Sequence, residues 1–204
     1  MSPIPDKMRA IGFIIVACFF LVNCTDTNSQ EGDQFFKIGD YEEAVKRYDQ
    51  YLKVNPDHVK SYYNRGRAYE ELEFEELARA DFEKVLELDP DNIQACSSLG
   101  GYYYNKQEYK SASSYYERAI SNNKDNPQSH FLKARSDHKM GLKTKAMNGY
   151  NTAIKLNPQY GEAYLYRGAL RSFLKQNKGA CADFAKARDL KVDKADITYS
   201  KFCQ

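Results

Sequence analysis

One pattern of small and apolar residues recurs along the chain at an interval of 34 positions. An alanine column consists of Ala44, Ala78, Ala112, Ala146 and Ala180. Four positions after each alanine stands an aromatic residue: Tyr48, Phe82, Tyr116, Tyr150 and Phe184. Three positions later come Tyr51, Val85, Ala119, Ala153 and Ala187. Because positions i, i+4 and i+7 share one face of an α-helix, the pattern predicts five amphipathic helices.

A fourth column of small residues predicts a partner helix before each of these five. It stands twelve positions before each alanine and consists of Gly32, Gly66, Gly100, Ala134 and Gly168. Small residues on both helices let the two axes approach closely, and we expect the aromatic residue to fill the gap between one repeat and the next. Pro56, Pro90 and Pro158 are predicted to end second helices, because proline cannot continue a helix.

Together with Tyr62, Tyr69, Tyr103 and Tyr164, these columns resemble the tetratricopeptide-repeat motif over residues 25–192. The resemblance implies an all-α fold, a right-handed α-solenoid of five helix-turn-helix repeats. The expected repeats span residues 25–58, 59–92, 93–126, 127–160 and 161–192. Apolar residues at Ala195, Tyr199 and Phe202 predict that residues 193–204 form a capping helix over the last repeat.

The N-terminal residues have the order of an export signal. Lys7 and Arg9 precede an uncharged apolar run over residues 10–22, so residues 1–23 are interpreted as a signal peptide, starting at Met1 or Met8. As a helix this run would be about 20 Å long, too short for the roughly 30 Å hydrocarbon layer of a membrane.

Residues 21–24 resemble the lipobox of bacterial lipoproteins. That resemblance implies that Cys24 carries lipid, that residues 24–30 form a tether, and that the protein is anchored to a membrane of the bacterial envelope. The outer membrane, with the repeats facing the periplasm, is the expected location. Two alternatives stay open: an uncleaved signal anchor, and an ordinary secretory signal in which Cys24 is incidental.

Composition and motifs argue against several function classes. The chain has 30 Lys and Arg against 28 Asp and Glu, so its charge does not indicate a nucleic-acid partner. His58, His130 and His138 lack the spacing of metal ligands, and no phosphate-binding or nucleophile-elbow motif occurs in the sequence. We therefore expect no enzyme activity, no cofactor, no metal and no small-molecule substrate.

Two of the five cysteines are predicted to form a disulfide. Cys181 lies on the second helix of the last repeat and Cys203 on the capping helix, and residue 192, midway between them, lies in the expected turn. An antiparallel pair of helices would then hold both sulfurs at the same height, and an oxidising periplasm would permit the bond. The alternative is two free thiols packed under the cap. Cys96 falls in an inward-facing column, where a thiol behaves as a small apolar residue.

The resemblance also implies where a partner would bind. In this motif the fifth, ninth and twelfth positions of each first helix face a concave groove. The expected groove residues are Tyr63, Arg67, Glu70, Tyr104, Phe131, Arg135 and His138, with Ser97, Gly101, Leu165, Ala169 and Ser172 at the remaining positions. Aromatic and arginine side chains dominate binding energy at protein interfaces, so we expect an acidic-aromatic peptide or helix as the ligand.

The expected function is a membrane-tethered scaffold for protein–protein interaction. The alternative is a structural subunit of an envelope assembly machine, of the outer-membrane protein assembly or pilus-pilotin type. Family members that bind chaperone C-termini hold a carboxylate with Lys and Asn at fixed positions. Those positions are occupied here by Ser29, Asp33, Tyr63, Asn64, Gln94 and Ser98, which argues against a chaperone-binding role.

Overall fold

The computed structural model describes residues 29–203 of the 204-residue chain, and its regular secondary structure there is entirely helical. Residues 29–38 are helical and precede ten further helices. These are α2 (Tyr41–Val54), α3 (Val59–Glu71), α4 (Glu75–Leu88), α5 (Ile93–Asn105), α6 (Tyr109–Asn122), α7 (Pro127–Lys139), α8 (Lys143–Leu156), α9 (Gly161–Phe173), α10 (Asn177–Asp189) and α11 (Ala195–Phe202). The expected all-α repeat fold is confirmed. The predicted signal peptide, Cys24 and residues 25–28 lie outside the described residues.

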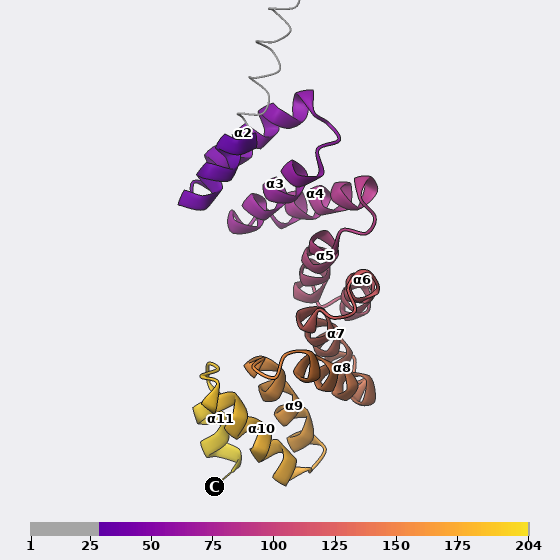
Figure 1. The fold of residues 1–204 in the computed structure, drawn as a ribbon, viewed down its shortest axis with the longest axis vertical. Helices are drawn as coiled ribbons and strands as arrows, with labels where there is room; N and C mark the ends of the chain where they lie inside the picture. The colour runs from indigo at the N-terminus through magenta and orange to yellow at the C-terminus, as the bar shows by residue number, and fades with distance from the viewer. Residues whose placement is uncertain (1–28, 204) are drawn as a thin grey trace, which may run out of the picture. The chain divides into compact units, whose positions relative to one another are not determined.

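The described helices form two compact units, which divide after Pro90. In the first unit α2 packs against α3, and α3 against α4. In the second, each helix from α5 to α11 packs against the next one in the chain. Figure 1 shows the two helices of each pair, such as α7 and α8 or α9 and α10, lying side by side. This packing of consecutive helix pairs is typical of a tetratricopeptide solenoid.

The two helices of each repeat are joined by the same tight turn. Its central residue has a positive φ in all five repeats: Gly39, Glu73, Gln107, Gly141 and Lys175. The next residue donates its backbone N–H to the carbonyl five residues earlier, for example Phe74 to Tyr69 at 2.9 Å and Leu142 to Asp137 at 2.9 Å. This is the Schellman arrangement, which satisfies the last carbonyls of the first helix and reverses the chain direction.

Polar side chains fix the start of three first helices, α3, α5 and α7. Asn92 Oδ1 accepts the backbone N–H of Ala95 at 3.0 Å, and Asn126 Oδ1 accepts those of Gln128 and Ser129 at 2.9 and 3.2 Å. These side chains satisfy N–H groups that have no partner within the helix. In these two repeats the turn and the cap together set where the helix pair begins and reverses, whereas α9 of the fifth repeat has no side-chain cap.

The columns found in the sequence form the core. All five alanines and all five aromatic residues of the first two columns are buried. A Cβ added to Gly100 would lie 2.5 Å from Tyr116 Cε1, and one added to Gly66 would lie 2.7 Å from Phe82 Cε1. Real Cβ atoms do not approach a ring so closely, so only glycine lets the two helices of these repeats come together.

These contacts correct the expected role of the aromatic column. Tyr116 and Phe82 lie on the second helices and pack over the glycine of their own repeat, not mainly in the gap before the next one. Tyr150 does both, since its ring centroid lies 6.0 Å from that of Phe131 in its own repeat and 6.3 Å from that of Tyr166 in the next. The aromatic residue therefore packs mainly between the two helices of its own repeat.

The fourth repeat achieves the close approach differently. Its first helix carries Ala134 in place of glycine, but Gly149 faces it from α8, where a Cβ would lie 2.7 Å from Ala134 Cβ. In the second and fifth repeats the equivalent of Gly149 is an aspartate, Asp81 or Asp183. A methyl group gained on one helix is thus matched by one lost on the other, and the helix spacing is kept.

Ion pairs join the seventh and twenty-third positions of several repeats, one on each helix of the pair. In the second repeat Arg65 donates to both oxygens of buried Asp81 at 2.8 and 2.6 Å, and also to Asp49 of the preceding repeat at 2.6 Å. In the fifth repeat Arg167 binds Asp183 in the same two-pronged way, at 2.9 and 2.7 Å.

The other repeats fill these two positions differently. In the first repeat the charges are exchanged, and Arg47 Nη1 lies 3.0 Å from Glu31 Oε2. Apolar Leu99 and Tyr115 hold the positions in the third repeat, and Lys133 and Gly149 hold them in the fourth. The first, third and fourth repeats therefore each have their own combination of residues at these two positions, whereas the second and fifth share one.

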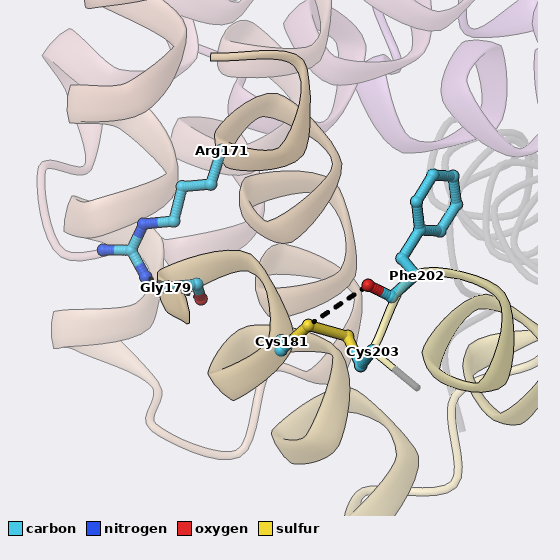
Figure 2. The surroundings of a disulfide bond; sticks show 5 residues. All are labelled: Arg171, Gly179, Cys181, Phe202 and Cys203. Atoms are coloured by element: carbon cyan, nitrogen blue, oxygen red, sulfur yellow. Dashed lines mark hydrogen bonds between the residues drawn. A yellow bond between two sulfur atoms is a disulfide. The ribbon is translucent and has the colours of Figure 1, made fainter. Parts of the chain in front are cut away.

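The C-terminal helix α11 packs against α10, and the structure joins the two through a disulfide between Cys181 and Cys203 (Figure 2). The Cα atoms of the two cysteines lie 5.5 Å apart, a usual distance for a bridged pair. Cys181 Sγ also lies 3.5 Å from the carbonyl oxygen of Phe202, a van der Waals contact because a cystine sulfur carries no hydrogen. The Phe202 ring lies 5.9 Å from that of Phe184, the last aromatic of the column.

We predict that the neighbouring glycines of α5 respond oppositely to alanine. Gly100→Ala should destabilise the protein by roughly 1–3 kcal/mol, because the new methyl group collides with the buried Tyr116 ring. Gly101→Ala is the matched control: its Cβ would meet only Tyr116 Oη, at 3.9 Å. That change should stabilise the helix by up to about 1 kcal/mol. Urea unfolding followed by circular dichroism measures both, and equal effects would contradict the packing described.

We further predict that the Cys181–Cys203 bridge forms in the exported protein. Thiol counting on the denatured, unreduced chain without residues 1–24 should then find one reactive cysteine, Cys96. Three reactive thiols would exclude the bridge. Because it closes a sequence separation of 22 residues, Cys203→Ser should lower the free energy of unfolding by about 3 kcal/mol in the chain-entropy model.

Candidate protein-interaction surface

Three aromatic side chains, from three successive first helices, surround the guanidinium group of one arginine. Arg135 on α7 lies with its Cζ 4.7 Å from the ring centroid of Tyr104 on α5 and 5.1 Å from that of Tyr166 on α9. Phe131, one turn before it, lies 5.7 Å away. We call Tyr104, Phe131, Arg135 and Tyr166 the Arg135 cluster. All four residues belong to the second compact unit.

The charge of Arg135 has no carboxylate partner among the described residues. Its Nε is buried and makes no hydrogen bond there, and its neighbours are ring faces. Guanidinium groups stack favourably on aromatic rings, so the rings hold the group in place. A buried donor without a partner is nonetheless unusual in a folded protein and requires an explanation.

Two tyrosine hydroxyls and one imidazole near the cluster are neutral near pH 7. Burial raises the pKa of Tyr116 to about 12, and the pKa of Tyr160 to about 12, although the charge of Arg135 acts in the opposite direction on both. Burial, assisted by the charge of Lys139, lowers the pKa of His138, whose Nδ1 lies 3.3 Å from Tyr150 Oη. Arg135 is therefore the permanent charge of the cluster, and the neighbouring hydroxyls are uncharged.

Phe131, expected to line the groove, is only 4% exposed and corrects that expectation. Its ring packs at 4.9 Å from Tyr160 and at 5.4 Å from Tyr166, measured between centroids. A ligand cannot reach a side chain so enclosed. Phe131 is therefore the buried member of the cluster, whereas Tyr104, Arg135, His138 and Tyr166 are partly exposed.

The groove residues expected in the second repeat lie in the first compact unit and differ in character. Glu70 Oε2 lies 2.7 Å from Arg67 Nε, outside the direction of the N–H bond, so the contact is an ion pair rather than a hydrogen bond. Glu71 lies 3.7 Å from Arg67 Nη2. The Tyr63 ring packs 5.7 Å from Phe82. Arg67 occupies the same repeat position as Arg135, but its charge is already balanced.

The remaining expected positions offer little chemistry. Ser97 donates its hydroxyl to the carbonyl of Ile93 at 2.8 Å, within its own helix. Leu165 and Ser172 are partly exposed and Ala169 is exposed. Gly101 has open space beside it, since an added Cβ would meet only Tyr116 Oη, at 3.9 Å.

The positions that clamp a carboxylate in chaperone-binding relatives are engaged internally in the first unit. Asp33 accepts hydrogen bonds from Asn64 at 2.7 Å, Lys60 at 2.7 Å and Tyr48 Oη at 2.8 Å. Burial alone would raise the pKa of Asp33, but these three donors outweigh it and hold the pKa below the usual value. Asn64 is thus used to satisfy a carboxylate of the protein itself.

A cavity lies beside α7, lined by other residues than those of the Arg135 cluster. A cavity of about 280 Å³ opens among α6, α7 and α8 where Gly149 leaves space. Its charged lining includes Lys133, which lies 3.0 Å from Asp137 and 3.4 Å from Glu117. His130 also borders it and is partly exposed, with Nε2 2.8 Å from the Lys124 carbonyl oxygen. The charges of Lys133, Asp137 and Glu117 satisfy one another.

Sequence reasoning missed Tyr166 and the buried ion pairs. Tyr166 stands at the sixth repeat position, outside the stripe expected to face the groove. The ion pairs had a usable signal: Arg65 and Arg167 occupy equivalent positions three repeats apart, as do Asp81 and Asp183. An arginine and an aspartate that recur together on facing helices indicate a salt bridge.

Across residues 29–203, no helix combines the length and the apolar character needed to cross a membrane. Nor do these residues contain a group of three His, Cys, Asp or Glu side chains placed to bind a metal ion.

Models of repeat families match the first half of the described chain. One, described as TPR repeat, matches residues 32–72. Another, described as tetratricopeptide repeat, matches residues 59–92 and 93–126. No curated protein matches the sequence.

Solved structures extend the likeness beyond the matched repeats. The crystal structure of MamA has 25% sequence identity and a TM-score of 0.73, with 81% of this chain and 96% of that chain covered. YrrB, described as a TPR protein with an unusual peptide-binding site, has 20% identity, a TM-score of 0.72 and coverage of 85% and 90%. PilW, a type IV pilus biogenesis factor, has 17% identity, a TM-score of 0.72 and coverage of 82% and 77%. The chain therefore carries tetratricopeptide repeats, and residues 29–203 have the fold of tetratricopeptide-repeat proteins.

Proposed function

We propose that this protein is a non-enzymatic scaffold that binds a peptide or helix of another protein on the face formed by α5, α7 and α9. The observation that carries the proposal is the Arg135 cluster. It gathers partly exposed aromatic rings and an unpaired charge from three consecutive repeats on one surface. Residues of these types supply most of the binding energy at protein interfaces.

The surface also has the rigidity that binding favours. The rings of Tyr104 and Tyr166 are held by contacts within the fold, Tyr104 against Tyr109 at 5.3 Å and Tyr166 against Phe131 at 5.4 Å. Because these side chains are already ordered, a ligand loses less conformational entropy when it packs on them. Gly101, on the same helix as Tyr104, leaves room for a side chain of the partner.

The comparisons support an interaction role at the level of the fold. Tetratricopeptide-repeat proteins are generally non-catalytic interaction scaffolds, and YrrB, which shares this fold, is described as having a peptide-binding site. A protein ligand for this chain is the corresponding proposal.

We also propose that lipid on Cys24 holds the scaffold on a membrane of the bacterial envelope, with the outer membrane and a periplasm-facing orientation favoured. The support is the order of residues 7–24, in which basic residues, an apolar run and the Leu21 to Cys24 box follow one another. Two acyl chains give stable anchoring where one is marginal.

A second candidate function is a structural subunit of an envelope assembly machine, of the outer-membrane protein assembly or pilus-pilotin type. The fold that the chain shares with PilW favours it. The two functions differ in the lifetime of the complex. A subunit co-purifies with its partners at fixed stoichiometry, whereas a scaffold that binds transiently is recovered with them only after crosslinking.

We predict that removing the exposed rings of the Arg135 cluster abolishes partner capture. Tyr104→Ala with Tyr166→Ala should reduce the crosslinked partner recovered from membranes by about tenfold or more, because interface aromatics each contribute roughly 1–2 kcal/mol or more. Quantitative mass spectrometry of crosslinked membranes measures the recovery.

The matched control removes a stacked tyrosine pair elsewhere in the same unit. Tyr103 and Tyr115 stack at 5.4 Å, and Tyr103→Ala with Tyr115→Ala deletes the same number of ring atoms. Circular dichroism and melting establish first that both variants fold. If the control loses the partner and the Tyr104 and Tyr166 variant keeps it, binding occurs on another face.

For the anchor, we predict that the mature protein begins at Cys24 and carries two or three acyl chains. Mass spectrometry of the N-terminal peptide tests this directly, and Cys24→Ala should abolish labelling by radioactive fatty acid. A chain that still begins at Met1 or Met8 would indicate a signal anchor instead. An unmodified mature N-terminus would indicate an ordinary secretory signal.

A further inference from the structure

The charges of the chain are divided between its two compact units. Residues 29–90 contain 9 Lys and Arg against 16 Asp and Glu, whereas residues 91–203 contain 19 Lys and Arg against 10 Asp and Glu. The small net charge of the whole chain, +2, therefore combines one acidic unit with one basic unit. Electrostatic attraction between two copies results when the acidic unit of one faces the basic unit of the other.

In the basic unit, lysines gather with exposed apolar side chains at the turns of the fourth and fifth repeats. Phe173 is 65% exposed, and Leu142 and Leu174 are also exposed. Lys143 Nζ lies 4.3 Å from the centroid of the Phe173 ring, so the α7–α8 turn and the α9–α10 turn form one continuous surface. We call this surface the basic edge. Its exposed lysines are Lys139, Lys143, Lys145, Lys175 and Lys178.

The lysines of the basic edge are not neutralised by carboxylates of the protein. Within residues 138–182 only Glu162 is acidic. Among residues 29–203, no carboxylate lies within ion-pair distance of these five lysines. Exposed apolar surface rimmed by charge marks an interaction site, and charge of one sign selects a partner of the opposite sign.

The turn of the second repeat, in the acidic unit, combines exposed apolar side chains with the opposite charge. Residues 70–77 contain five glutamates and no basic residue. Phe74, 54% exposed, and Leu77 lie among them. Arg67 and Arg79 flank the segment and pair with some of its glutamates, but two arginines leave an excess of negative charge. We call residues 70–77 the acidic turn.

We propose that the acidic turn of one copy docks on the basic edge of a second copy, so that the protein associates head to tail. Phe74 and Phe173 supply apolar contact, and the glutamates and lysines around them supply charge complementarity. Because the two surfaces differ, each copy keeps one of them free for the next copy. The proposal goes beyond the proposed function, since neither surface includes a residue of the Arg135 cluster.

A second copy accounts for more of these observations than an anionic membrane does. Negatively charged lipid headgroups would attract the basic edge. They would repel the acidic turn and give its exposed Phe74 no role, whereas a second copy uses both surfaces. The contact joins a few turns only, and small interfaces below about 1,200 Å² are typical of weak, transient complexes.

The experiment is analytical ultracentrifugation of the lipid-free chain from residue 25 onwards, which contains every described residue. At low salt we expect association that increases with protein concentration, with a Kd in the micromolar to submillimolar range. At high salt the protein should be monomeric, because the screening length falls from about 30 Å at 0.01 M to about 3 Å at 1 M.

Two variants each remove one of the surfaces. Lys143→Gln with Phe173→Ala takes a charge and a ring from the basic edge, and Glu73→Gln with Phe74→Ala takes a charge and a ring from the acidic turn. All four side chains are exposed, and circular dichroism verifies that the variants fold. Each variant alone should associate about tenfold more weakly than the wild type, or not at all.

An equal mixture of the two variants should form a one-to-one dimer with the affinity of the wild-type contact and no larger species. The first variant retains the acidic turn and the second retains the basic edge, so one intact contact forms between them. This recovery distinguishes a head-to-tail contact from one in which both copies use the same surface.

The matched control is Lys53→Gln with Val54→Ala, which removes an exposed lysine and an exposed apolar side chain from the end of α2. It should leave the association unchanged. If a ring deletion prevents folding, charge-only variants take its place: Lys143→Gln with Lys175→Gln, and Glu71→Gln with Glu73→Gln.

Three results would overturn the proposal: a wild-type chain that is monomeric at low salt, association that both variants retain, or a mixture of variants that stays monomeric. Flotation with vesicles of phosphatidylglycerol and phosphatidylcholine tests the membrane alternative. A monomeric chain that binds these vesicles through Lys143 and Phe173 would assign the basic edge to lipid. Partner capture by Tyr104 and Tyr166 is measured separately, so either idea can fail without the other.

Discussion

The contact on which the rest of this structure depends is the packing of an aromatic ring directly against a glycine. At Gly66, Gly100 and Gly168 the ring from the second helix occupies the volume that a Cβ would need. This fixes how closely the two helices of a repeat approach, and the tight turn at positive φ fixes how they reverse. With both set, the first helices of successive repeats come to lie near enough for Tyr104, Arg135 and Tyr166 to meet.

Much of this fold could be predicted from the sequence because its determinants are side chains that recur every 34 residues. The turn could not, although it recurs just as regularly. Its central residue is glycine in two repeats but Glu73, Gln107 and Lys175 in the others, so the left-handed conformation is imposed by the flanking helices and not by residue type. The aromatic column was found, but its partner was not, because spacing along the chain does not say which neighbouring helix a ring covers.

In the candidate site, too, the sequence predicted what depends on a single helix and not what depends on contacts between helices. A stripe at helical spacing was enough to select Tyr104, Arg135 and His138, which depend only on the face of their own helix. Phe131 was misjudged, because its burial comes from Tyr160, at the end of its own repeat, and from Tyr166 of the following repeat. Tyr166 was missed because the residues equivalent to it are Gln30, Asn64, Ser98 and Leu132, which give no hint of an aromatic contact at that position. Contacts between repeats depend on which residue happens to stand opposite, and a repeating motif does not contain that information.

The varied pairs at the seventh and twenty-third repeat positions bear on a hazard peculiar to repeated sequences, the docking of one repeat's helix onto another's partner during folding. If the first helix of the second repeat packed on α8, Arg65 would face Gly149 and Asp33 would lose the donors it receives from Lys60 and Asn64. The second and fifth repeats share the Arg and Asp pair, yet even these differ in the preceding repeat, where Asp49 serves one arginine and Asn151 the other. Near-identical backbones are thus kept from exchanging partners by side chains that are not identical, and the chain is directed to a single register.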